Sequence, residues 1–124
     1  MKKNPLINVL RAFAPAVIWA GIIFFFSDQE VLPGLSISAF DFLLKKSAHI
    51  FVFAILYLLL MKGFGQVRPS SRYSWWQALL ICLLYACADE IHQTMVSGRN
   101  ASTIDVGFDI TGVTLAFLRH HRYI

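Results

Sequence analysis

Cysteine and charged residues are both scarce in this sequence. The two cysteines, Cys82 and Cys87, lie in one apolar run of a 124-residue chain, so a disulfide-stabilised scaffold is excluded. Charged residues make up 15% of the chain and hydrophobic residues 57%, whereas a soluble domain carries about 25% and about 45–50%. Abundant apolar surface with little charge excludes a disordered chain, and the length allows one domain at most. The composition is typical of an integral membrane protein.

Four long segments lack Lys, Arg, Asp and Glu, apart from two aspartates in the last of them. They cover residues 12–27, 47–61, 73–88 and 100–118, and flanking apolar residues extend each one toward the roughly 20 residues that cross a bilayer core. A segment of that length in lipid is expected to be helical, because a helix satisfies its own backbone hydrogen bonds. The sequence therefore predicts one all-α domain, residues 1–124, with four transmembrane helices at about 6–27, 42–62, 73–92 and 102–119.

The basic residues are distributed unequally between the two ends of these helices. If the helices alternate in direction, eight of the 11 Lys and Arg residues share one side with both chain termini. The positive-inside rule then predicts that both termini are cytoplasmic, which is an N-in/C-in orientation. No basic stripe or recognition helix indicates nucleic acid as a partner. The residues on the predicted cytoplasmic side are Lys2, Lys3, Arg11, Lys62, Arg68, Arg72, Arg119 and Arg122.

Polar and ionisable side chains gather at the predicted outer ends of the last three helices. Several of them are spaced i,i+3 or i,i+4, so that the members of a pair share one helical face. Ionisable groups this close to lipid are costly unless they pair, face the bundle interior or line a wet cavity. We therefore interpret them as one cluster, whose members are Lys46, His49, Glu90, Gln93, Arg99, Asp105 and Asp109.

The order of these residues forms a recognisable pattern. It is Lys46-x-x-His49, then Asp89-Glu90-x-x-Gln93, then Gly98-Arg99, Asp105 and Gly112. In this pattern the chain resembles the VanZ-like family of small membrane proteins over nearly its whole length. The resemblance implies a multi-pass protein of the bacterial plasma membrane and a link to resistance against teicoplanin-type lipoglycopeptides; it implies no mechanism.

The chain also departs from the usual pattern of that family at three positions. Asp109 stands where asparagine is commoner, Met95 where an aromatic residue is usual, and Ser97 where proline often precedes Gly-Arg. The departure at residue 109 leaves Asp109 without an assigned role in the sequence-based site.

The first functional hypothesis is an enzyme that acts at the outer leaflet on a cell-envelope amphiphile. The candidate substrates are a membrane lipid headgroup, a lipid-linked wall precursor and the lipoglycopeptide itself. Guanidinium and ammonium groups suit phosphate or carboxylate, and a histidine beside a carboxylate suits proton transfer. The predicted catalytic residues are His49, Glu90 and Asp105, and the predicted substrate-binding residues are Lys46, Gln93 and Arg99.

The second hypothesis is a non-catalytic membrane binder or scaffold, in which the charged cluster is an ion-pair network that pins the helices together. Asp105 also has a simple structural interpretation, because Ser102-x-x-Asp105 has the spacing of a capping box. His49, Glu90 and Asp105 are of the types that bind metals, but no HExxH or paired-histidine spacing accompanies them, so no metal site is predicted. The sequence specifies no cofactor and leaves a homo-oligomer open.

Overall fold

The computed structural model describes residues 4–27, 38–69, 72–95 and 103–123, with the side chains of residues 26–27, 38–45 and 103–105 left out of the description. Within these ranges the chain forms four α-helices and no strand: α1 (Pro5–Ser27), α2 (Ser38–Val67), α3 (Ser74–Thr94) and α4 (Thr103–His120). The predicted all-α fold with four helices is confirmed. Helix α2 extends beyond both of its predicted bounds of 42 and 62.

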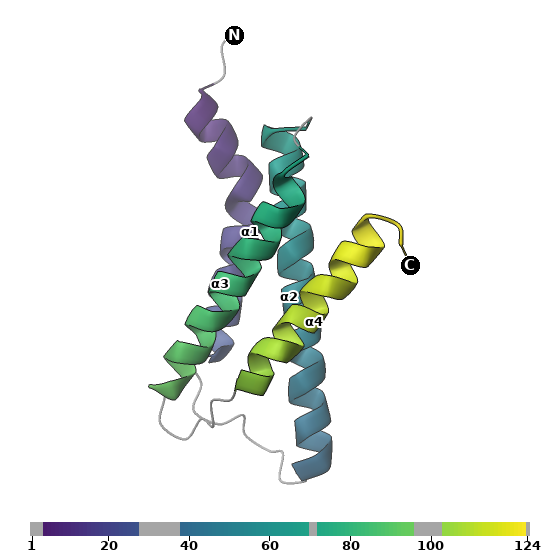
Figure 1. Cartoon of the computed structure of the whole chain (residues 1–124). Coiled ribbons are helices and arrows are strands. Elements are labelled where there is room, and N and C mark those ends of the chain that lie inside the picture. Colours follow the sequence, from purple (N-terminus) through teal and green to yellow (C-terminus); the bar gives the residue numbers. More distant parts are fainter. Residues whose placement is uncertain (1–3, 28–37, 70–71, 96–102, 124) are drawn as a thin grey trace.

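The helices alternate in direction, so α1 and α3 run one way while α2 and α4 run the other (Figure 1). We call the end at which α2 and α4 begin the polar end, and the opposite end, at which α1 begins and α4 ends, the terminal end. Helix α2 packs against all three other helices, most extensively against α4. In the described part of the chain α1 and α4 do not pack against each other, so they flank α2 and α3 from two sides.

The buried face of α3 changes character along its length. Its buried residues are Ser74, Ala78, Cys82, Ala86, Asp89 and Gln93, which recur every three or four positions and form one stripe. Small side chains fill the first four positions and let neighbouring helices approach closely. The last two positions are polar, so α3 inserts an acid and an amide into the packed interior near the polar end.

Two aromatic side chains pin α1 to its neighbours through hydrogen bonds. The indole N–H of Trp19 donates to the carbonyl oxygen of Val52 on α2 at 2.8 Å. The hydroxyl of Tyr85 on α3 donates to the carbonyl oxygen of Ala20. Buried Trp and Tyr usually need a partner for their polar atom, and here backbone carbonyls supply it.

The outer surface of the four helices is strongly apolar. Residues Pro5–Phe25 and Lys46–Val67 have mean hydropathies of 1.8 and 2.0, so two of the described helices are long and apolar enough to cross a membrane. Large side chains such as Val17, Phe51 and Leu84 are more than 60% exposed. A soluble monomer rarely exposes so much contiguous apolar surface, and lipid tails solvate it readily. These features indicate a membrane protein.

Helix α4 approaches the backbone of α2 very closely at Gly112. A Cβ atom added at Gly112 would lie 2.0 Å from the carbonyl oxygen of Ile50 and 2.8 Å from its carbonyl carbon. Real Cβ atoms do not come this near to backbone, so only glycine permits this contact. At Gly107, in the same helix, an added Cβ would meet no atom within 4 Å.

We predict that Gly112→Ala destabilises the fold by about 1–3 kcal/mol, because the α2 or α4 backbone must shift to admit the methyl group. Thermal unfolding of the purified protein in detergent measures the effect as a lower Tm. Gly107→Ala is the matched control and should leave the Tm unchanged or raise it, because alanine is the better helix former by about 1 kcal/mol. Equal Tm values for the two variants would contradict the close approach.

Candidate functional site

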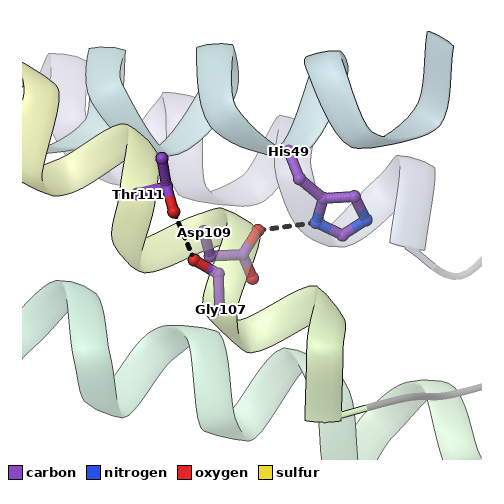
Figure 2. A network of polar contacts seen from close by, with 4 residues as sticks. All are labelled: His49, Gly107, Asp109 and Thr111. Carbon is purple, nitrogen blue, oxygen red and sulfur yellow. Dashed lines mark hydrogen bonds and ion pairs between the residues drawn. The ribbon is translucent and has the colours of Figure 1, made fainter. Parts of the chain in front are cut away.

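A histidine of α2 and an aspartate of α4 meet in the interior near the polar end. The Nδ1 atom of His49 lies 2.6 Å from the Oδ1 atom of Asp109 (Figure 2). The Asp109 side chain is 3% exposed and that of His49 is 17% exposed. A carboxylate only accepts hydrogen bonds, so with Asp109 ionised Nδ1 carries the proton and donates it. The contact is short, as is usual where one partner is charged.

The register between α2 and α4 brings this pair together. Asp109 lies three residues before Gly112, on the same face of α4, and His49 directly precedes Ile50. The contact between Gly112 and the Ile50 backbone therefore places Asp109 at the level of His49. Helices α2 and α4 run in the same direction, so contacts that follow along the interface keep nearly the same sequence separation.

Lys46 lies one turn before His49 on α2 and also faces α4. Its Nζ atom lies 5.4 Å from the centroid of the Phe108 ring, which is within the range of a cation–π contact. Phe108 directly precedes Asp109. The interface between α2 and α4 thus has a cation, an imidazole and a carboxylate within about one helical turn.

Helix α3 contributes polar side chains at the polar end of the bundle. Asp89 is 6% exposed and Gln93 is 3% exposed, and both belong to its buried stripe. Glu90 is half-buried. His92 is half-buried and its ring lies 4.6 Å from that of Phe24 on α1, which places the end of α3 against the end of α1.

The structure describes some of the site residues predicted from the sequence but not all of them. Lys46, His49, Glu90 and Gln93 lie in the half of the bundle near the polar end, on helices that pack against one another. The whole of Arg99 and the side chain of Asp105 lie outside the described residues. One partner of His49 in the structure is Asp109, which the sequence analysis left without a role.

A sequence signal for Asp109 existed in its spacing. It lies four residues after Asp105 and three before Gly112, so all three share one face of α4. A glycine on a helix face indicates that another helix packs closely there, so an acid on the same face lies beside a close helix contact. Sequence spacing shows that the two aspartates share a face, but it does not show which of them lies level with His49.

The His49–Asp109 pair has two kinds of chemistry open to it. A hydrogen-bonded imidazole and carboxylate can transfer protons, or they can serve as an internal tie between two helices. In the described part of the chain, no three His, Cys, Asp or Glu side chains lie together in a way that could hold a metal ion.

The terminal end has a different chemical character. Arg68 at the end of α2 donates a hydrogen bond to the side-chain oxygen of Gln77 on α3. The aromatic rings of Trp75 and His121 both pack against Phe117, at 5.7 and 4.5 Å between centroids. Partial burial, together with neighbouring His120, lowers the pKa of His121. This end combines basic and aromatic residues, as the headgroup region of a membrane favours.

Together, the apolar exterior, the four helices and the buried polar pair define a small helical membrane protein with a polar interior site. A sequence profile of the VanZ/LLP1 family matches residues 12–121, and the chain belongs to this family. The sequence-based resemblance to VanZ-like proteins is thereby confirmed. No curated protein and no solved structure shows significant similarity to the chain.

We predict that His49→Leu destabilises the protein by about 3–5 kcal/mol, because it leaves the Asp109 carboxylate buried without the imidazole. The double variant His49→Leu/Asp109→Leu should recover much of this loss, since it removes the stranded charge as well. Unfolding in detergent of His49→Leu, Asp109→Leu and the double variant measures the coupling free energy between the two residues. His120→Leu, at an exposed position, is the control and should have little effect. Additive effects of the two single substitutions would show that the pair is not energetically coupled.

Proposed function

We propose that this VanZ-family protein spans the bacterial plasma membrane four times and acts at the outer leaflet on a cell-envelope amphiphile. The amphiphile is a membrane lipid headgroup, a lipid-linked wall precursor or a lipoglycopeptide, and the action contributes to resistance against teicoplanin-type antibiotics. The protein needs no nucleic acid partner for this function. The link to antibiotic resistance is carried over to this chain from its resemblance to the family.

The observation that supports this proposal is the concentration of buried polar groups in the half of an apolar bundle nearer the polar end. Asp109 and His49 are hydrogen-bonded between α2 and α4, and Asp89 and Gln93 are buried on α3. Ionisable residues in a membrane domain are expensive to bury, and such residues commonly line the route or site of a polar substrate. A purely structural bundle of this size can be packed with apolar residues at lower cost.

The proposed roles follow from the chemistry of each group. Lys46, beside the α2–α4 interface, and Arg99 bind the phosphate or carboxylate of the headgroup. His49 exchanges a proton with the substrate, while Glu90 and Asp105 supply negative charge. Gln93 forms a hydrogen bond to the substrate or to Glu90.

One contact favours a second candidate function, a non-catalytic binder or scaffold. The His49–Asp109 hydrogen bond joins residues that are sixty positions apart, on two different helices, so it also serves as a structural tie. In that case the cations bind a headgroup or an envelope partner and no bond in the amphiphile is broken. This candidate would be favoured if His49→Ala still binds the amphiphile and if neither this variant nor wild type converts it.

The orientation is supported by the chemistry of the terminal end. Tyr73, Trp75 and Trp76 are exposed at the start of α3. Among the described residues, the Lys and Arg side chains toward that end are Arg11, Lys62, Arg68, Arg72, Arg119 and Arg122. Lys and Arg collect on the cytoplasmic side of membrane proteins, and Trp and Tyr collect at the interface. The polar end then faces the outer leaflet.

We predict that a reporter enzyme active only in the periplasm is inactive when fused after Ile124, because the C-terminus is cytoplasmic. A reporter active only in the cytoplasm, fused at the same position, should be active. The reverse result would overturn the N-in/C-in orientation and, with it, the placement of the polar end at the outer leaflet.

We predict that wild-type protein raises the teicoplanin tolerance of a sensitive bacterial host and that Glu90→Gln abolishes the increase at matched membrane abundance. The substitution keeps the side-chain size and removes one charge, so it tests chemistry more than packing. Glu30→Gln is the matched control, because Glu30 is the only other glutamate in the chain and lies outside the polar cluster. Equal protection by all three proteins would assign Glu90 a structural role, and no protection by wild type would overturn the resistance function.

A further inference from the structure

We propose that Asp109 is the positioning residue of the site: it holds the Nδ1–H of His49, so that Nε2 is the nitrogen that exchanges a proton with the substrate. This inference rests on the proposed function, because it assigns the residue that orients the histidine of that same site. It also changes the site predicted from the sequence, in which Glu90 and Asp105 were the catalytic carboxylates.

The first argument is the geometry of the pair. Nδ1 lies 2.6 Å from the carboxylate of Asp109, and with that carboxylate ionised Nδ1 is the hydrogen-bond donor. The neutral imidazole then has its lone pair on Nε2, because one ring nitrogen is a donor and the other an acceptor. In Figure 2 the second ring nitrogen is directed away from Asp109.

The second argument is the unequal burial of the two partners. The Asp109 side chain is 3% exposed, whereas that of His49 is 17% exposed. The carboxylate is therefore the enclosed partner, and the imidazole is the partner with access to its surroundings. A relay that exchanges protons with a substrate requires this order, with the fixed anion inside and the proton carrier outside.

The third argument is the rigidity of the support for Asp109. One turn further along α4, Gly112 contacts the Ile50 backbone, and Val113 is 1% exposed. Helix α4 thus cannot slide along α2 without a steric clash or an exposed core residue. A carboxylate held this way keeps the His49 ring in one orientation. Less free energy is then needed to orient the base for each reaction.

The proton step balances within these groups. The O–H bond of a water or headgroup hydroxyl breaks, its electron pair stays on oxygen, and its proton bonds to Nε2. The imidazolium that forms lies beside the Asp109 carboxylate, which remains ionised and stabilises it. The oxygen then bonds to the phosphorus or carbonyl carbon of the headgroup, and the bond from that atom to the leaving group breaks with its electron pair on the leaving group. The leaving group takes the proton from Nε2, which restores the neutral ring.

Nitrogen-15 NMR of ring-labelled histidine in the full chain, purified in lipid nanodiscs, tests the assignment without any substrate. The His49 signals are identified by their loss in His49→Gln, and His92, His120 and His121 serve as internal references. In wild type the neutral His49 ring should be protonated on Nδ1. In Asp109→Asn the tautomer protonated on Nε2 should appear, because the anion that favours Nδ1–H is lost.

Two further variants separate positioning from simple damage to the fold. Asp109→Glu retains a carboxylate and should retain the Nδ1–H tautomer. Thr111→Val removes a hydroxyl that donates to the carbonyl oxygen of Gly107, on the same helix (Figure 2), and should leave the His49 signals unchanged. A wild-type His49 ring protonated only on Nε2, or an unchanged tautomer in Asp109→Asn, would overturn the assignment.

The same variants in the tolerance assay separate this inference from the proposed function. Where wild type protects, Asp109→Asn should lose the protection and Thr111→Val should keep it. Full protection by Asp109→Asn despite an altered tautomer would overturn the positioning role. Failure of wild type to protect would overturn the proposed function, whereas the tautomer result would still decide whether Asp109 sets the ring of His49.

Discussion

The contact between Gly112 of α4 and the backbone of Ile50 on α2 is the constraint on which the rest of this structure depends. It sets the distance between the two helices and also their register, because a residue with a side chain at position 112 would meet the Ile50 carbonyl group. Pairs on both sides of this contact follow from that register, and they have nearly the same sequence separation. These pairs are Lys46 with Phe108, His49 with Asp109, and Tyr57 with Phe117.

The apolar exterior explains why polar groups lie in the interior of the bundle. A side chain that cannot reach water must find its partners inside the protein, and the observed partners follow this rule. The hydroxyls of Thr111 and Thr114 donate to carbonyl oxygens one turn earlier in α4, and Trp19 donates to a carbonyl on α2. The His49–Asp109 pair is the charged counterpart of these bonds.

The sequence predicted the helices well because apolar runs of membrane length have few alternative structures. The bounds of α2 were less predictable, since Asp41 is charged and Gly63 and Gly65 are typical of a turn, yet all three lie within the helix. The gathering of His49, Glu90 and Gln93 in one half of the bundle also follows from helices that alternate in direction. The partner of His49 did not follow, because helical spacing relates residues within a helix and cannot set the register between α2 and α4. Arg99 and the side chain of Asp105 lie outside the described residues, so their predicted roles stay predictions.

A structural hydrogen bond between helices and a proton relay differ in how deeply their two partners need to be buried. A tie gains most when both partners are enclosed and every polar atom is satisfied by protein, since solvent access weakens the attraction. A relay needs one enclosed partner that keeps its charge and one that reaches the substrate. The exposures of 3% for Asp109 and 17% for His49 match the second arrangement. Packed apolar side chains can replace a purely structural hydrogen bond at little cost, so the unequal burial of this pair, beside the close approach at Gly112, supports the proposed proton exchange at the imidazole.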